Sequence, residues 1–377
     1  MLKRNIRHNF FLILSTLTLG ACAQESHIEA APGVTEYQLE LVTTGVSIPW
    51  GMVWLNTNDL LVSDKTGELR LIRNGLLLDE KIAGLPEVDT RGQGGLLDVE
   101  IDPNYAENGW IYIAYSGYEG EGGGTNTSVL RARLDEMELV DKLIIFNGEP
   151  NSERGFHYGS RLEFDTQGYL YITLGDRGER DVNPQRLDTD AGKVHRIHAD
   201  GSIPQDNPFV GQAAANASIF SYGHRNPQGM ALHPTTGQVW THEHGPKGGD
   251  EINILKKAAN YGWPVITYGR NYSGTTITDR THMDGMVQPQ WQWTPSIAPS
   301  AMHFVTSARY PEWQGRMLVG SLKFQYLLLM EIDNDKVVSQ TKIFEDVGRL
   351  RSISQSPEGY IYIGTDGNGI FKIVTVE

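Results

Sequence analysis

Side chains that bind anions or transfer protons recur at equivalent places in this sequence, beside the ends of short strand-like segments. Guanidinium and ammonium groups bind anions through charge-assisted hydrogen bonds, and a histidine can accept a proton near neutral pH. Such cationic groups in a chain whose formal charge is -14 suggest an anionic ligand. The candidates are Gln93, His157, Arg225, Asn226, Lys323, Arg349 and Arg351.

Each candidate taken alone also has an ordinary structural explanation. His157 can be a buried hydrogen-bonding residue, and Arg225-Asn226-Pro227-Gln228-Gly229 can be a tight turn. Residues 245–251 can form a flexible acidic loop. The functional interpretation therefore depends on whether the fold brings these segments together.

A strand, a turn and a second strand recur six times along the chain. In each repeat an apolar segment leads into a turn, and the second strand is rich in aromatic and β-branched residues, as pleated sheets prefer. The repeats lie at residues 52–62, 97–115, 162–174, 230–241, 304–319 and 353–363.

These hairpins predict an all-β fold, a six-bladed β-propeller of four-stranded antiparallel sheets over residues 36–377. An early strand at residues 37–42 lies outside the first hairpin, and we expect it to close the ring against residues 370–376. A β-sandwich rarely supplies six equivalent hairpins, and a β-helix would have a shorter and stricter repeat.

Hairpin geometry also predicts one shared functional face. The first strand of each hairpin crosses the blade and the second returns, so residues just before the first and just after the second lie at the same end. The first set is Pro49-Trp50, Gln93, His157, Arg225-Asn226 and Arg349-Leu350-Arg351. The second set is Asp176-Arg177, His244-Gly245-Pro246, Lys323 and Asp366.

The N-terminus resembles a bacterial lipoprotein signal peptide, residues 1–22. Basic residues precede an apolar run, Phe10 to Leu19, that is too short to span a bilayer as a mature helix. The run ends in Leu19-Gly20-Ala21-Cys22, and Cys22 is the only cysteine. We expect export to the periplasm, acylation of Cys22 as a lipid anchor, and a tether at residues 23–35. A plain signal peptide cut near Ala21 or Ala23 is the alternative.

Composition excludes several other classes of partner. The net charge of -14 disfavours nucleic acid, since binding its phosphates needs clustered Lys and Arg. One cysteine allows no internal disulfide and no Cys-x-x-Cys-His haem attachment. If the protein performs redox chemistry, its electrons must leave through a separate acceptor, which the sequence does not identify.

An ordered series of short motifs resembles the glucose/sorbosone dehydrogenase family, and within it the compact soluble aldose sugar dehydrogenases. The resemblance covers residues 36–376, so a chance match to one heptapeptide does not explain it. The motifs are Ile48-Pro49-Trp50-Gly51-Met52, Gly92-Gln93-Gly94-Gly95-Leu96-Leu97, His157-Tyr158-Gly159-Ser160-Arg161-Leu162, Gly223-His224-Arg225-Asn226-Pro227-Gln228-Gly229, Glu243-His244-Gly245-Pro246, Asp250-Glu251-Ile252-Asn253 and Asn260-Tyr261-Gly262-Trp263-Pro264.

The resemblance implies oxidation of an aldose sugar at C1 with pyrroloquinoline quinone (PQQ). His157 matches the family's general base, and its ordinary pKa of about 6.5 suits that role. Arg225 matches the residue that polarises the reacting carbonyl of the quinone. The positions that match quinone contacts, which would face its three carboxylates, are Gln93, Arg225, Asn226, Lys323, Arg349 and Arg351.

The resemblance also implies two calcium ions. The backbone carbonyls of Gly245 and Pro246 match ligands of a calcium that sits on the cofactor as a Lewis acid. The side chain of Glu251 and the carbonyl of Tyr261 match a second, structural site. The insertions that provide dimer contacts in larger relatives are missing, so we expect a monomer.

Two positions depart from the family pattern. Phe156 stands before the histidine where several relatives have a polar residue, so the group that orients the imidazole is not evident. Arg177 stands where some relatives have a smaller amide near the sugar, so the preferred sugar is left open.

Two other functions are compatible with a propeller. A calcium-dependent lactonase or hydrolase predicts side-chain carboxylates around one axial metal, with no redox cofactor. A non-catalytic surface-binding propeller would need neither His157 nor the cationic rim.

Overall fold

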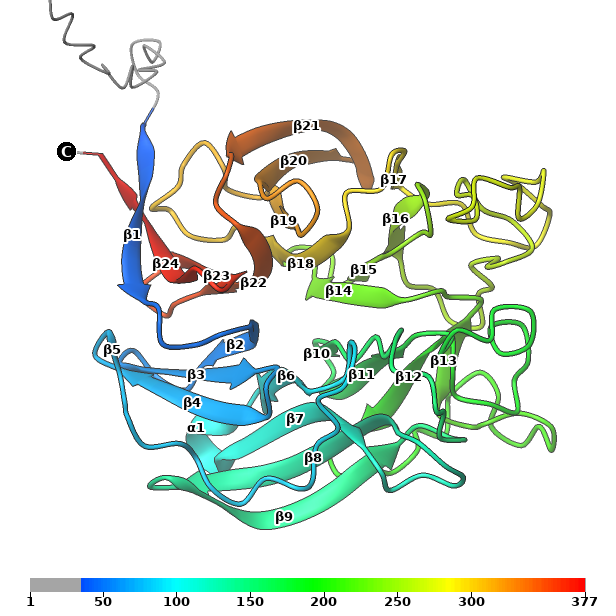
Figure 1. Ribbon diagram of the computed structural model, residues 1–377, viewed down its shortest axis with the longest axis horizontal. Helices are drawn as coiled ribbons and strands as arrows, with labels where there is room; N and C mark the ends of the chain where they lie inside the picture. Colours follow the sequence, from blue (N-terminus) through cyan, green and yellow to red (C-terminus); the bar gives the residue numbers. More distant parts are fainter. Residues whose placement is uncertain (1–34, 377) are drawn as a thin grey trace, which may run out of the picture.

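The computed structural model describes residues 35–376, which form six four-stranded antiparallel sheets arranged around a ring (Figure 1). The predicted six-bladed propeller is therefore confirmed. In each blade the strand that begins the predicted hairpin is innermost, and these six strands contact one another around the central axis. No helix within the described residues is both long and apolar enough to cross a membrane.

The first three blades follow chain order from the axis outwards. Blade 1 contains β2 (Pro49–Trp54), β3 (Asp59–Asp64), β4 (Glu68–Arg73) and β5 (Leu76–Leu77). Blade 2 contains β6 (Leu96–Ile101), α1 (Tyr105–Asn108) between its first two strands, β7 (Trp110–Gly117), β8 (Asn126–Asp135) and β9 (Glu138–Asn147). Blade 3 contains β10 (Leu162–Phe164), β11 (Tyr169–Leu174), β12 (Lys193–His198) and β13 (Ile219–Tyr222).

The last three blades repeat this order, except that the sixth takes its outer strand from the N-terminal end of the propeller. Blade 4 contains β14 (Pro227–Leu232), β15 (Val239–Glu243), β16 (Asp250–Ile254) and β17 (Trp291–Trp293). Blade 5 contains β18 (Pro299–Phe304), β19 (Met317–Ser321), β20 (Leu327–Asp333) and β21 (Lys336–Phe344). Blade 6 contains β22 (Arg349–Gln355), β23 (Ile361–Asp366), β24 (Gly369–Thr375) and β1 (Tyr37–Thr43).

The pairing of β1 with β24 closes the ring, as predicted (Figure 1). The register runs antiparallel from Tyr37 opposite Thr375. Tyr37 also packs on Trp313, with ring centroids 4.4 Å apart, and its hydroxyl donates to Glu312 at 2.9 Å. The predicted signal peptide, Cys22 and all of the tether except its last residue lie outside the described residues.

The apolar core consists of clusters that lie between neighbouring blades. Side chains alternate across each strand, so both faces of an inner sheet can be buried. On β7, Ile111 and Ile113 pack towards blade 1, whereas Tyr112 and Ala114 pack towards blade 3. Equivalent clusters occupy the other interfaces between blades.

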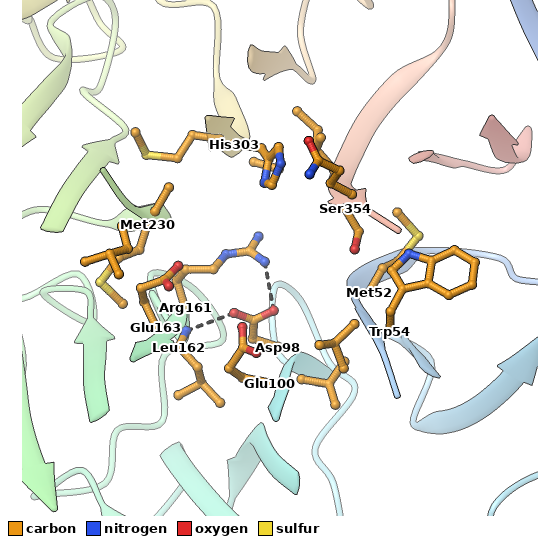
Figure 2. Close-up of a pocket in the computed structure, with 18 of the residues that line it drawn as sticks. Met52, Trp54, Asp98, Glu100, Arg161, Leu162, Glu163, Met230, His303 and Ser354 are labelled. Atoms are coloured by element: carbon orange, nitrogen blue, oxygen red, sulfur yellow. Dashed lines mark hydrogen bonds and ion pairs between the residues drawn. The ribbon is translucent and has the colours of Figure 1, made fainter. Parts of the chain in front are cut away.

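A buried ion pair connects the blades at the central axis (Figure 2). Arg161 of blade 3 donates to Asp98 of blade 2 at 2.8 Å and to the carbonyl of Gln228 in blade 4 at 3.1 Å. It also donates to the carbonyl of Ser300 in blade 5 at 3.4 Å, and its guanidinium lies 4.2 Å from the ring centroid of Trp50 in blade 1. One side chain therefore contacts four other blades.

Breaking this pair should destabilise the propeller. Arg161→Ala leaves the carboxylate of Asp98 buried without its partner, which should cost about 3–5 kcal/mol in the free energy of unfolding. Urea denaturation measures this cost. The control is Arg73→Ala, which breaks an exposed pair with Asp59 and should cost about 1 kcal/mol or less. Equal losses in the two variants would contradict an anchoring role for Arg161.

Candidate active site

His157 lies in the segment between β9 and β10, and its backbone has the unusual positive φ of 57°. Its N–H donates to the side-chain oxygen of Gln93 at 2.8 Å. Gly175 lets this segment approach β11, because a Cβ at that position would lie 2.3 Å from the carbonyl oxygen of His157. Phe156 packs edge-on to the imidazole, with centroids 4.9 Å apart. The fold therefore holds His157 at a strained position, which often accompanies function.

Asp176 is the group that orients the imidazole. Nδ1 of His157 lies 2.6 Å from Oδ1 of Asp176, which also accepts from the N–H of Gly178 at 2.7 Å. The other oxygen accepts from the indole Nε1 of Trp263 at 2.8 Å. The sequence placed Asp176 on the predicted rim but assigned it no role. Asp176, which follows β11 of the same blade, thus orients the imidazole in place of Phe156, which has no polar group.

The charges around this pair leave His157 neutral and Asp176 ionised. Burial lowers the pKa of His157, the hydrogen bond to Asp176 works in the opposite direction, and Arg225 lowers the pKa further. Burial acts to raise the pKa of Asp176, but the hydrogen bond and charge of His157 outweigh it, so this pKa lies below its usual value. Nδ1 of His157 therefore donates to the carboxylate, and Nε2 keeps the lone pair of a general base.

Arg225 lies beside this pair, at the end of the chain segment that leads into β14. Its N–H donates to Oε2 of Glu243 at 2.5 Å, which fixes the backbone. Nη1 donates to the carbonyls of His244 at 2.8 Å and Gly245 at 3.1 Å. The guanidinium also lies 5.5 Å from the ring centroid of Trp263. Trp263 therefore contacts both Arg225 and the carboxylate that orients His157.

These groups line a cavity of about 450 Å³ at one end of the axis. The side chain of His157 is 13% exposed, which leaves its ring accessible from this cavity. The lining residues are Gln93, Phe156, His157, Asp176, Gly178, Arg180, Arg225, Pro246, Trp263, Asn271 and Tyr272.

Three further predicted cations lie on blades 5 and 6. Arg351 donates to both oxygens of Asp366, at 3.0 and 2.7 Å, and Arg349 approaches the same carboxylate at 3.4 Å. Nζ of Lys323 donates to the carbonyl of Ser296 at 3.1 Å. These three residues do not line the cavity that contains His157.

Hydrogen bonds of His244 connect blade 4 with blade 5: Arg225 donates to its carbonyl, and its imidazole contacts Pro299 at the start of β18. The ring nitrogen Nε2 of His244 donates to the carbonyl of Pro299 at 2.5 Å. Its pKa is lowered to about 3 by burial first, and then by Arg225, His157 and Arg351. Charged or titratable groups of blades 3, 4 and 6 therefore all contribute to the lowered pKa of this buried imidazole.

Asn226 is buried and holds the neighbouring blade. Its side-chain oxygen accepts from the N–H of Gly159 at 3.1 Å, and the residue is 1% exposed. This contact fixes the segment that follows His157 and leaves Asn226 beside the cavity rather than on its lining.

Three of the four predicted metal-binding residues, Gly245, Glu251 and Tyr261, line a small second cavity, whereas Pro246 lines the cavity of His157. The small cavity has a volume of about 10 Å³, enough for one water-sized or ion-sized occupant. Glu251 is partly buried there, and this burial, followed by the charge of Glu243, raises its pKa to about 8. Two carboxylates around a space of this size fit an oxygen-liganded cation, although no group of three Asp, Glu, His or Cys side chains among residues 35–376 could hold a metal ion.

Arg177, which matches a position near the sugar in some relatives, does not line the cavity of His157. Its guanidinium turns inwards and donates to the carbonyls of Phe156, Thr125 and Arg154, and it stacks 3.5 Å above the ring of Tyr158. The residue is therefore 1% exposed and fixes the loop that carries His157. The direction of this side chain could not be predicted from its place after the strand, because Arg177 has an unusual backbone angle, a positive φ of 52°.

Other cavity residues were not identified from the sequence. Arg180, Asn271, Tyr272 and Trp263 belong to loops, for which the hairpin repeat gives no register. Trp263 had one detectable signal, since it lies within the Asn260–Pro264 motif.

A third cavity, of about 550 Å³, lies along the inner strands at Arg161 (Figure 2). Glu100, Glu163 and Asp98 line it. Burial raises the pKa of Glu100 to about 8, with Asp98 contributing, and raises the pKa of Glu163 well above its usual value. His157 and Arg225 do not line this cavity, so the carboxylates of the axis are separate from the candidate base.

An oriented, neutral imidazole beside an arginine in an open cavity is the arrangement of an enzyme active site, here carried by a β-propeller. Comparison with known proteins identifies the family: residues 46–373 match the family model described as Glucose / Sorbosone dehydrogenase, so the chain belongs to that family of oxidoreductases.

Individual relatives agree with this assignment. Aldose sugar dehydrogenase YliI of Escherichia coli (strain K12) is 39% identical over 366 residues, covering 96% of each chain. Quinoprotein glucose dehydrogenase B of Acinetobacter calcoaceticus is 24% identical, covering 88% of this chain and 86% of that protein. The crystal structure of the soluble aldose sugar dehydrogenase of E. coli in the apo form superposes with a TM-score of 0.85 at 37% identity, covering 90% of this chain and 100% of that one.

Asp176→Asn should reduce aldose oxidation by about 100- to 10,000-fold, because an amide can stabilise the wrong tautomer of the base. His157 must be neutral to act, so wild-type kcat/KM should be lost only as pH falls through a midpoint below about 6.5. Since Asp176 raises the pKa of His157, the Asn variant should shift that midpoint to still lower pH. Steady-state pH profiles with a dye acceptor measure both effects.

The companion variants separate positioning from general damage. Trp263→Phe removes the donor to Asp176 and should lower kcat about tenfold, but it should have little further effect in the Asp176→Asn background. Asp188→Asn alters a carboxylate of the same connection that is 48% exposed and pairs with Arg186, which does not line the cavity, and should leave the rate unchanged. Fully additive losses would contradict the role assigned to Trp263.

Proposed function

We propose that this protein oxidises aldose sugars at C1 to lactones, with PQQ as the hydride acceptor and calcium as the associated metal ion. The observation that carries the proposal is the neutral His157, fixed by Asp176 and facing the same cavity as Arg225. Membership of the glucose/sorbosone dehydrogenase family supplies the reaction class.

The cationic face suits a cofactor with three carboxylates. Arg225, Lys323, Arg349 and Arg351 supply guanidinium and ammonium donors, and Gln93 and Asn226 supply amides. Lys323 donates to one carbonyl, Arg225 donates to two, and Arg349 and Arg351 share the carboxylate of Asp366, so an anionic ligand would offer these groups further acceptors. The relative from A. calcoaceticus is named a quinoprotein, which supports the same choice.

The residues of the chain account for the proton transfer. Nε2 of His157 removes the proton of the anomeric hydroxyl, and the carboxylate of Asp176 stabilises the resulting imidazolium. PQQ, if bound, would supply a hydride acceptor for C1. Loss of the hydroxyl proton to His157 and of the hydride from C1 together convert the aldose to the lactone. Arg225 lies beside the base and supplies positive charge where negative charge develops.

Calcium would occupy two places in blade 4. Carbonyl oxygens of Gly245 and Pro246 would hold the ion next to the cofactor, where it acts as a Lewis acid. The carboxylate of Glu251 and the carbonyl of Tyr261 would hold the second ion in the cavity of about 10 Å³. An ion there offsets the repulsion between Glu251 and Glu243.

The proposed setting follows from the N-terminal sequence and the charge. We place the protein in the periplasm as a monomer, anchored to the membrane by a lipid on Cys22, without a nucleic-acid partner. Reduced cofactor would pass its electrons to an external acceptor whose identity is open. The sugar that it prefers is open as well.

Reconstitution tests the proposal directly. Purified protein given PQQ, calcium, an aldose and an artificial acceptor should reduce the acceptor, and His157→Ala should lower the rate about 100- to 10,000-fold. Arg225→Ala should also reduce it. His303→Ala changes a histidine that lines the other cavity and should retain activity. Equal reduction of the acceptor without added quinone would instead indicate another redox cofactor, and no reduction by the wild type would contradict the dehydrogenase.

Calcium should stabilise the protein through Glu251. With calcium at about 100 times its Kd, one site adds about 2.7 kcal/mol to the free energy of unfolding, which thermal unfolding detects as a higher Tm. Glu251→Gln keeps the shape of the side chain and should reduce this increase. Glu345→Gln, at an exposed carboxylate of blade 5, should keep it in full. The same increase in all three proteins would place the ion elsewhere.

A further inference from the structure

The entrance of the cavity is formed in part by a small hairpin in the long connection between β16 and β17. Arg270 and Thr276 form an antiparallel bridge, and the N–H of Asn271 donates to the carbonyl of Thr275 at 2.9 Å. Gly274, with φ of 93°, allows the tight turn, and its N–H donates to the carbonyl of Asn271 at 2.8 Å. The hairpin is therefore a defined structure.

A contact across the entrance fixes the hairpin relative to the catalytic loop. Nη1 of Arg180 donates to the side-chain oxygen of Asn271 at 2.6 Å. Arg180 follows Asp176 by four residues, on the loop after β11. Both partners line the cavity of His157. The hairpin thus keeps a set position relative to the catalytic base.

Tyr272 lies next to this contact and presents its ring to solvent. It is 74% exposed, the largest value among the big apolar side chains of residues 35–376, yet it also lines the cavity that contains His157 and Arg225. A single exposed aromatic residue has no meaning by itself. Here the exposed ring lines the candidate reaction site and follows Asn271, which Arg180 fixes.

We propose that Tyr272 is an outer binding platform for the second sugar ring of a reducing oligosaccharide. This inference rests on the proposed function. Reaction at C1 holds the reducing ring at His157, so a ring joined to its far side must extend towards the entrance. A sugar ring has an apolar C–H face that can lie on an aromatic ring, and hydroxyls that can accept from a guanidinium such as that of Arg180.

Kinetics with the reconstituted holoenzyme test the platform. In Tyr272→Ala, kcat/KM for cellobiose and maltose should fall about fivefold to tenfold, mainly through KM, while kcat/KM for glucose stays within about twofold. Tyr272→Trp keeps an aromatic surface and should retain the preference of the wild type. Tyr118→Ala removes an exposed tyrosine, 44% exposed, that does not line the cavity, and should change neither substrate.

Each other outcome has a distinct meaning. Equal loss with glucose and disaccharides would overturn the platform, because it would show general damage to the site. A rise in KM for the acceptor alone would overturn it in favour of an acceptor contact. Unchanged disaccharide kinetics would also overturn it. If the wild type oxidises glucose in the same assay, each of these failures belongs to the platform; if it does not, the proposed function fails first.

Discussion

The fold depends on the ion pair between Asp98 and Arg161, because a propeller must bring its inner strands together around an axis that side chains have to fill. Arg161 reaches four neighbouring blades, and a guanidinium can do this since it carries five donors in a fixed plane. The uncompensated carboxylates Glu100 and Glu163 lie on one cavity at this pair, and the candidate base lies on another. The carboxyl groups whose pKa values burial raises therefore lie in a different cavity from His157.

Asp176 has the corresponding role in the site. Its two oxygens accept from the imidazole of His157, the backbone of Gly178 and the indole of Trp263, so blade 3 and the long connection of blade 4 meet at one carboxylate. These donors keep the carboxylate ionised despite burial. A strained segment can therefore present a neutral imidazole at the cavity, because the surrounding bonds determine its orientation.

The propeller and its closure could be predicted from the sequence. Strands with alternating apolar residues, separated by turns, form a repeat that can be recognised even though the repeats are unevenly spaced. The sequence also predicted that residues beginning and ending hairpins share a face, since strand parity alone requires this. It did not predict that Arg177 points inwards, that Asp176 orients His157, or that Tyr272 reaches the cavity. These features depend on the sign of the backbone angle φ and on loop conformation, which the pattern of hydrophobic residues does not determine.

The long connection in blade 4 links the small cavity lined by Glu251 to the candidate base, His157. Tyr261 lines the cavity of Glu251, and Trp263, two residues further on, donates to Asp176. The ring of Tyr261 stacks on His224, whose Nδ1 lies 3.1 Å from Glu243, the same carboxylate that fixes the backbone of Arg225. The contacts that stabilise this connection therefore also position His157 and Arg225. The same residues thus contribute to the stability of blade 4 and to the geometry of the candidate site.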